Sequence, residues 1–295
     1  MVWLAIPICG DGSVYARRWS LLSACLTSFV LVVGQANAGV TGRVDCDQKT
    51  KFCLINGLTI NGTIDDTTTA ALSQLIETFG SQRDPKVQTA DLTGTTIKLD
   101  SPGGSVPAAM AIGRLLRMNR MKAFVDPYAS CLSSCVLIYA GAVARFGQNE
   151  LARVGIHQPY FLVPSQQVDA DTVRKSYVAL LSNIRAYLRE MNVSEQLADE
   201  MMKISPSNVR YLTADEQEQF GLSLIDPIER ETSALEQAQK LGLDRFEYNR
   251  REALSMKLCP LDSSFGSCYR SIMKTGKSNL PDFSKYGTRV NGPGL

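Results

Sequence analysis

Short apolar runs alternate with longer segments of helical periodicity along most of this chain, and that alternation restricts the fold more than any other feature. We predict strands at 95–99, 123–125, 153–156 and 222–225, and helices at 106–120, 133–142, 171–191, 194–202 and 213–220. Repeated strand and helix alternation is typical of an α/β fold with a largely parallel sheet.

The preceding segment, residues 51–64, alternates apolar and polar residues around two Asn-Gly steps. Such steps favour tight hairpin turns, so we predict short strands there. Asp65 or Asp66 is the expected N-cap of a following helix. In the helix at 106–120, the pattern predicts outward positions for Arg114, Arg117 and Arg120.

The N-terminus has the pattern of a cleaved secretory signal. Two arginines at 17–18 precede an apolar stretch at 21–33 and an Ala-Asn-Ala step at 36–38. The alternative is an uncleaved anchor, which the short apolar stretch disfavours because a spanning helix needs about 20 residues. We therefore expect residues 1–38 to be removed and the protein to be periplasmic or secreted.

Six cysteines remain after that cleavage, and they form three pairs of near neighbours: Cys46 with Cys53, Cys131 with Cys135, and Cys259 with Cys268. An even number of cysteines in an exported protein favours disulfides, although six cysteines allow 15 pairings. A zinc site is the alternative, but the chain has no Cys-x-x-Cys motif. We predict the three near-neighbour disulfides.

The composition excludes several classes of protein. The 31 basic and 29 acidic side chains leave a formal charge of only +2, so a nucleic-acid partner is not expected. His157 is the single histidine, which argues against a histidine-built metal site. We expect no metal or other cofactor.

Three segments carry groups suited to acyl transfer. A Ser-Pro-Gly-Gly-Ser motif at 101–105 follows a strand, a Cys-Leu-Ser-Ser-Cys motif at 131–135 begins a helix, and His157 ends a strand. A hydroxyl, an imidazole and free backbone N–H groups can act as nucleophile, base and oxyanion hole. Each signal alone is weak, but α/β folds place their sites where strands meet helices.

These motifs resemble those of the Clp-type serine peptidases of the crotonase-like superfamily, and in particular exported bacterial relatives with a Cys-x-Ser-x-Cys element. The resemblance runs from about residue 58 to 226 and includes the motifs at 101–106, 156–159 and 210–213. It implies a spiral of repeated β-β-α units. Past Glu229 the sequence becomes a charged helix and then a segment with two cysteines, so we expect a domain at 39–228 and a helical, disulfide-containing appendage at 229–295.

The resemblance also implies residue roles. Ser133 lies 29 residues after Gly104, as expected for nucleophile and oxyanion glycine, and is preferred to Ser134. The N–H groups of Gly104 and Ser134 would form the oxyanion hole, and His157 would be the base. The helix at 171–191 is similar to the one through which Clp subunits pack, so a homo-oligomer is expected.

The chain departs from the family at the triad carboxylate, where it has Asn208 and Val209. Asn208 can orient an imidazole but cannot stabilise its positive charge. Asp199 or Glu200 could supply the carboxylate instead. An exported protein also has no ATP for an unfolding ATPase, so we expect no such partner.

Three functions are consistent with these residues. The favoured one is an exported serine hydrolase that acts on peptides or proteins. The second is a non-catalytic peptide- or protein-binding module on the same fold. The third is a crotonase-like enzyme for acyl-CoA, which export disfavours because coenzyme A is intracellular.

Overall fold

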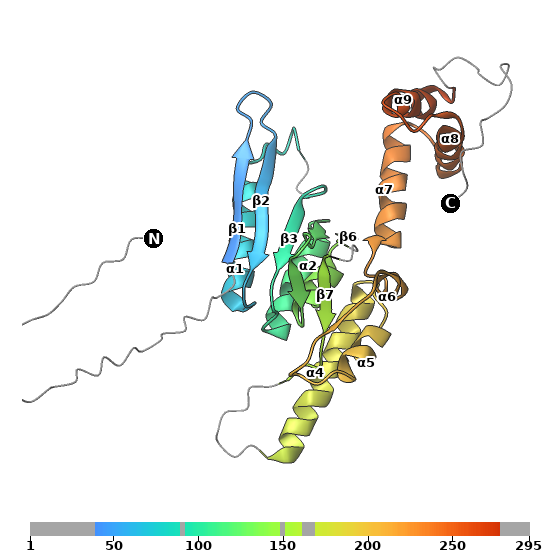
Figure 1. Cartoon of the computed structure of the whole chain (residues 1–295). Helices are drawn as coiled ribbons and strands as arrows, with labels where there is room; N and C mark the ends of the chain where they lie inside the picture. The colour runs from blue at the N-terminus through green and yellow to red at the C-terminus, as the bar shows by residue number, and fades with distance from the viewer. Residues whose placement is uncertain (1–38, 89–91, 148–150, 161–168, 278–295) are drawn as a thin grey trace, which may run out of the picture. The chain divides into compact units, whose positions relative to one another are not determined.

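The structure is a computed structural model that describes residues 39–88, 92–147, 151–160 and 169–277 (Figure 1). The predicted signal peptide, residues 1–38, lies outside the described residues, as does the end of the appendage at 278–295. None of the helices within the described ranges is both long enough and apolar enough to cross a membrane.

The main sheet has the strand order β1-β2-β3-β4-β6-β9. Its strands are β1 (Gly39–Cys46), β2 (Cys53–Asn61), β3 (Thr96–Asp100), β4 (Lys122–Phe124), β6 (Ala144–Phe146) and β9 (Leu224–Ile225). The four central strands run parallel, whereas β1 and β9 pair antiparallel at the two edges. The largely parallel sheet agrees with the prediction from the strand and helix alternation.

A smaller sheet lies beside the motifs that the sequence singles out. β5 (Ser130–Leu132) pairs parallel with β7 (Arg153–Ile156), and β7 pairs antiparallel with β8 (Arg210–Tyr211). A single bridge between Ser101 and Cys131 connects this sheet to the end of β3. The motifs at 101–105 and 131–135 therefore start from adjacent backbone positions.

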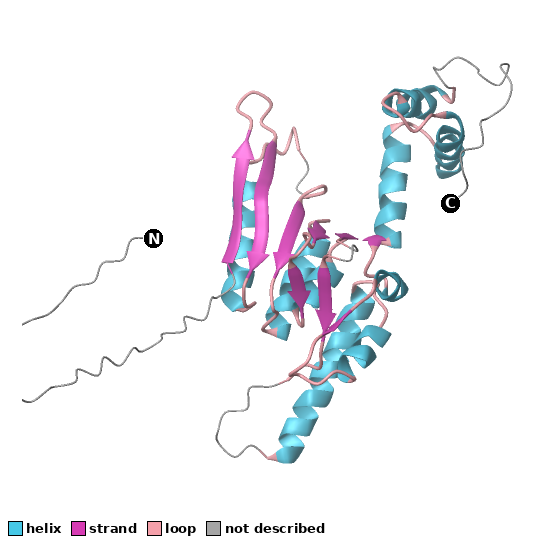
Figure 2. Cartoon of the chain, viewed as in Figure 1, coloured by secondary structure: helices cyan, strands magenta, loops and turns pink. Residues whose placement is uncertain are grey.

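Helices pack against the strands, as the secondary-structure colouring shows (Figure 2). They are α1 (Asp66–Gln82), α2 (Val106–Met118), α3 (Cys135–Gly141), α4 (Ala170–Glu190), α5 (Gln196–Met202) and α6 (Ala214–Phe220). Buried apolar side chains from these helices and the strands form one core, for example Leu58, Ile60, Leu72, Ile97, Leu116 and Leu188. The combination of a parallel sheet with packed helices confirms the α/β fold class.

Local capping explains where several helices begin. Asp65 caps α1 through a capping box with Thr68, Ser105 caps α2, and Thr213 caps α6 through a capping box with Glu216. The prediction of Asp65 or Asp66 at the start of α1 is therefore confirmed for Asp65.

The strand structure predicted for residues 51–64 is confirmed by β2, but the hairpin turn does not lie at the first Asn-Gly step. The turn lies at 47–52, and β2 runs through the first Asn-Gly step without reversing. Gly57 there has a φ of 64°, next to a register shift between β1 and β2. The Asn-Gly step thus creates a bulge, because the positive φ of glycine accommodates an extra residue in the ladder.

The outward prediction also fails for two of the three arginines in α2. Arg117 pairs with buried Asp226 at 3.0 Å, and Arg120 pairs with Glu229 at 2.7 Å. Arg114, by contrast, is half-exposed and pairs with Glu190. Arg117 and Arg120 face acidic partners that follow β9 in the chain. The periodicity of a single helix cannot reveal such partners.

The appendage consists of α7 (Pro227–Lys240), α8 (Arg245–Leu258) and α9 (Phe265–Thr275). Cys259 and Cys268 form a disulfide between α8 and α9, and both lie in a small apolar cluster with Ile272. Asp226 caps α7 by accepting from the N–H groups of Ile228 and Glu229. The appendage therefore has its own small core.

Candidate active site

Ser133 occupies a tight turn between a strand and a helix. β5 ends at Leu132 and α3 begins at Cys135, and Ser133 between them has a φ of 56°. That left-handed conformation is uncommon for a residue other than glycine, and such strain occurs preferentially at functional sites. The turn is held by the N–H of Ser133, which donates to the carbonyl of Gly155 at 2.9 Å.

The glycine motif packs directly against this turn. A Cβ atom added to Gly103 would lie 2.6 Å from the Cβ of Ser133 and 3.1 Å from the N of Ser134. Only glycine permits this approach, and Gly103 also has a φ of 100°. Two contacts fix the loop: Ile64 donates its N–H to Gly103 O at 2.9 Å, and Ser101 Oγ accepts from Gly103 N–H at 3.0 Å.

The two N–H groups assigned to the oxyanion hole have no hydrogen-bond acceptor within the described part of the chain. Their neighbours differ: the N–H groups of Gly103, Ser105 and Ser133 each donate to a protein acceptor. Backbone N–H groups in folded proteins are nearly always paired. Gly104 and Ser134 thus offer two free donors, and each directly follows one of the two residues, Gly103 and Ser133, that pack against each other.

His157 directly follows β7, and β7 pairs with β5, the strand that ends just before Ser133. The parallel register pairs Leu132 with Gly155, so Ser133 and His157 both continue from the carboxyl ends of adjacent strands. The imidazole is buried, and its Nδ1 lies 2.9 Å from the carbonyl oxygen of Gln158. A carbonyl can only accept, so Nδ1 must donate, and in the neutral ring Nε2 is then the acceptor.

That tautomer suits a general base. Nε2 is left without a hydrogen-bond partner among the described residues, and no hydrogen bond joins it to Ser133 Oγ. Catalytic hydrogen bonds of this kind often tighten only when substrate binds. The backbone of Gln158 therefore supplies the orienting contact for His157.

The structure does not bring Asn208 to His157. The Asn208 side chain is exposed, and among the described residues it has no hydrogen bond to the imidazole. Asp199 pairs with Arg185, and Glu200 pairs with Lys203 and Arg210, so these carboxylates have other partners. The described residues thus show no side-chain hydrogen bond to His157 from Asn208, Asp199 or Glu200.

Val209 comes directly before β8 and packs close to β7. In the antiparallel ladder of β7 and β8, Gly155 pairs with Tyr211 and Ile156 pairs with Arg210, which is the last pair. A Cβ added to Gly155 would lie 2.6 Å from Val209 Cγ1. We infer that the same register, continued by one residue, would place the apolar side chain of Val209 opposite His157.

Cys131 and Cys135 form a disulfide that spans the turn, with a Cα–Cα distance of 5.2 Å. Both are fully buried, at the end of β5 and the start of α3. Cys46 and Cys53 are also joined, across the hairpin of β1 and β2. Together with the disulfide in the appendage, these are the three predicted pairs.

Two functional features have no signal in the residue pattern alone. Gly103 was part of the glycine motif, but its contact with Ser133 depends on how two distant loops meet. The carbonyl of Gln158 is a backbone group, which every residue possesses. The only indication of this role in the sequence was that Gln158 directly follows the single histidine at the end of a strand.

Comparison with known proteins gives one clear match. No curated protein sequence matches the chain significantly. The sequence model of the Clp protease family matches residues 59–231, which is more than half of the chain. That range contains the glycine motif, Ser133 and His157 but excludes most of the appendage, and it shows that the chain belongs to the Clp protease family.

Proposed function

We propose that this protein is an exported serine hydrolase that cleaves peptides or proteins with a Ser-His pair. Family membership supports a serine peptidase. The observation that carries the specific assignment is the pair of unpaired N–H groups, Gly104 and Ser134, beside a serine in a left-handed turn. This arrangement suits a nucleophile with an oxyanion hole.

The reaction follows from the contacts of these groups. Nε2 of His157 accepts the proton of Ser133 Oγ as the oxygen attacks the substrate carbonyl, and the N–H groups of Gly104 and Ser134 stabilise the resulting oxyanion. His157 then donates the proton to the leaving amine, which leaves an acyl-enzyme on Ser133. Water, deprotonated by His157, attacks the ester and regenerates the serine.

The absence of a carboxylate contact to His157 in the described residues predicts slow turnover. A triad carboxylate stabilises the imidazolium that forms during attack, whereas the Gln158 carbonyl supplies only a neutral acceptor. The same observation favours a second candidate function, a binding module that holds peptides without cleaving them.

Export is part of the proposal. Three disulfides are compatible with an oxidising compartment outside the cytoplasm. We infer a signal peptide at 1–38, a catalytic domain at 39–228 and an appendage at 229–295. The Cys-x-Ser-x-Cys element supports kinship with exported bacterial members. Without ATP in that compartment, the protein works without an unfolding ATPase.

Helix α4 supports assembly of several copies. Leu180 and Leu181 on this helix pack against the main core, but Val178 is 63% exposed and Val173 is only partly buried. We infer that the exposed part of α4 around Val178 packs against another subunit.

Peptide hydrolysis by matched serine variants tests the proposal. Ser133→Ala should abolish turnover of a casein-derived peptide mixture, whereas Ser134→Ala should retain it, because the second variant keeps the backbone N–H. Loss in Ser134→Ala with activity in Ser133→Ala would assign the nucleophile to the neighbouring residue. Saturable peptide binding without any cleavage would favour the binding module.

A further inference from the structure

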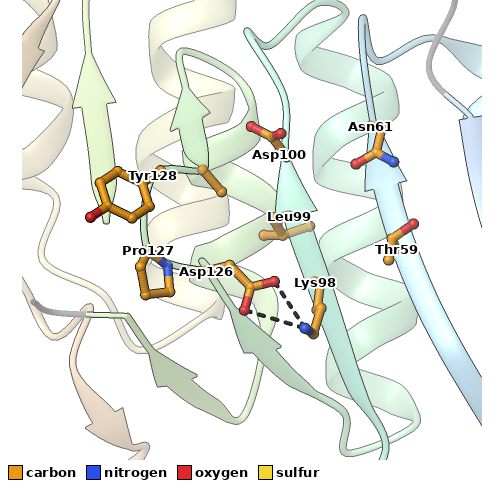
Figure 3. A pocket seen from close by; sticks show the side chains of 9 residues that line it. Thr59, Asn61, Lys98, Leu99, Asp100, Asp126, Pro127 and Tyr128 are labelled. Atoms are coloured by element: carbon orange, nitrogen blue, oxygen red, sulfur yellow. Dashed lines mark hydrogen bonds and ion pairs between the residues drawn. The ribbon is translucent and has the colours of Figure 1, made fainter. Parts of the chain in front are cut away.

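A cavity of about 370 Å³ lies on one face of the main sheet, and its lining includes the charged side chains of Lys98, Asp100 and Asp126 (Figure 3). Its walls come from β2, β3 and the segment between β4 and β5. The parallel register pairs Thr59 with Lys98 and Asn61 with Asp100, so these side chains share one face. Neither Ser133 nor His157 lines the cavity.

The cavity has one carboxylate without a cationic partner. Lys98 Nζ lies 2.9 Å from Asp126 Oδ2 and 3.2 Å from Asp126 Oδ1, so these two charges compensate each other. Asp100 Oδ1 accepts from the N–H of Ser130 at 2.9 Å, and in the described chain Asp100 has no ion pair. The formal charge of the lining is therefore −1, and it resides at Asp100.

An aromatic ring borders the same space. Tyr128 is 73% exposed and has a φ of 70°, a conformation that is rare for tyrosine. Its backbone is fixed on both sides: its N–H donates to Leu151 O at 2.9 Å, and its carbonyl accepts from Arg153 Nη2 at 2.9 Å. The ring of Tyr128 and the carboxylate of Asp100 both line the cavity (Figure 3).

We propose that this cavity binds a basic side chain, arginine or lysine, displayed by a partner protein. The cation forms a charge-assisted hydrogen bond with the free oxygen of Asp100 and lies over the face of Tyr128. The exposed amide of Asn61 adds an acceptor oxygen that a guanidinium can reach. An acidic side chain is repelled by Asp100, and an apolar one would bury that carboxylate unpaired.

The proposal is independent of hydrolysis at Ser133, so binding is measured directly. The probe is N-acetyl-arginine amide, titrated into the full mature protein and followed by the backbone amide signal of Ser130. That N–H donates to Asp100 and reports contact at the carboxylate. We expect a saturable shift with a Kd of about 1 mM, as suits a single side chain.

Variants locate the binding site. Asp100→Asn keeps an oxygen for the Ser130 N–H but removes the charge, and should weaken binding roughly tenfold or more. Tyr128→Leu keeps apolar bulk without the aromatic face and should weaken binding roughly threefold. The control Asp66→Asn removes an exposed carboxylate from α1 and should leave binding unchanged.

N-acetyl-glutamine amide distinguishes binding of the positive charge from non-specific binding, because its side chain is polar but uncharged. The proposal is overturned if the glutamine compound shifts the Ser130 signal as strongly as the arginine compound. It is also overturned if no saturable shift occurs, or if both the Asp100 and Tyr128 variants bind arginine with wild-type affinity. Retained melting temperatures establish that the variants are folded.

Discussion

Gly103→Ala tests the close contact between the glycine motif and the catalytic turn. The new methyl group would lie 2.6 Å from the Cβ of Ser133 and 2.8 Å from the carbonyl oxygen of Leu132. Ordinary van der Waals contacts begin at 3.4 Å, so the backbone segments around Gly103 and Ser133 must separate by about 0.8 Å. A displacement of about 1 Å at a reacting atom costs roughly a hundredfold in rate.

Stability is also affected by this substitution. Alanine at a φ of 100° costs about 1–3 kcal/mol, and forcing a methyl group into a packed contact costs about 1–3 kcal/mol more. Gly94→Ala is the matched control, because Gly94 has a φ of 96° but no atom within 4 Å of an added Cβ. Gly94→Ala therefore has the same unfavourable backbone energy but makes no contact with Ser133.

The assay is the rate of labelling by a fluorophosphonate, combined with thermal unfolding. We expect Gly103→Ala to label roughly a hundredfold more slowly than wild type, and Gly94→Ala to label at the wild-type rate with a modestly lower Tm. Wild-type labelling in Gly103→Ala would show that the contact between Gly103 and Ser133 does not position the nucleophile. Equal slowing in both variants would show the same, since the effect would then arise from backbone strain alone.

Three further predictions concern the disulfide, the triad and pH. Cys131→Ala/Cys135→Ala should slow labelling roughly tenfold while lowering the free energy of unfolding by only about 2 kcal/mol, measured by denaturant titration; unchanged labelling would show that the disulfide does not position the nucleophile. Val209→Asp should raise peptide turnover roughly tenfold, because the β7–β8 register continued by one residue would place position 209 opposite His157, whereas Asn208→Asp should not; the reverse order would show that the register does not continue in this way. Backbone and side-chain hydrogen bonds from Thr213, together with Arg210, lower the pKa of Glu216. The ionised Glu216 carboxylate therefore stabilises the fold above about pH 4.5, and this contribution is lost as the pH falls through the lowered pKa. Glu216→Gln should therefore be less stable than wild type by about 1–2 kcal/mol at pH 7 and equally stable near pH 2, and a gap that persists in acid would contradict this.

The elements with strong periodicity or clear capping were predictable from the sequence. β7 (Arg153–Ile156) has the predicted bounds, and α4 differs by one residue at each end. Their signals are local, because a run of apolar residues or a helical repeat is visible within the segment itself. The α/β fold class follows from the order of such segments.

Other elements were missed because their signal is too short or not local. β5 and β6 have three residues each, which is too few to show a period of two. β1 pairs with β2 across a hairpin whose turn contains neither Asn-Gly step. Short strands of this kind form because neighbouring strands supply their hydrogen bonds, which is a tertiary effect.

The candidate site was predictable in its residue types but not in its contacts. Ser133, His157 and Gly104 could be chosen from motifs at strand ends. The orienting role expected for Asn208 depended on a tertiary contact that the sequence does not encode, and among the described residues Asn208 makes no hydrogen bond to His157. The backbone carbonyl of Gln158 fills the orienting position.

Labelling with a fluorophosphonate shows whether Ser133 is an activated nucleophile, because only an activated serine reacts. The mature protein is incubated with the reagent, digested, and mapped by mass spectrometry. We expect a single phosphonate adduct on Ser133 that is absent in Ser133→Ala and strongly reduced in His157→Ala. An adduct on Ser134, or no adduct in folded wild-type protein, would contradict this role of Ser133.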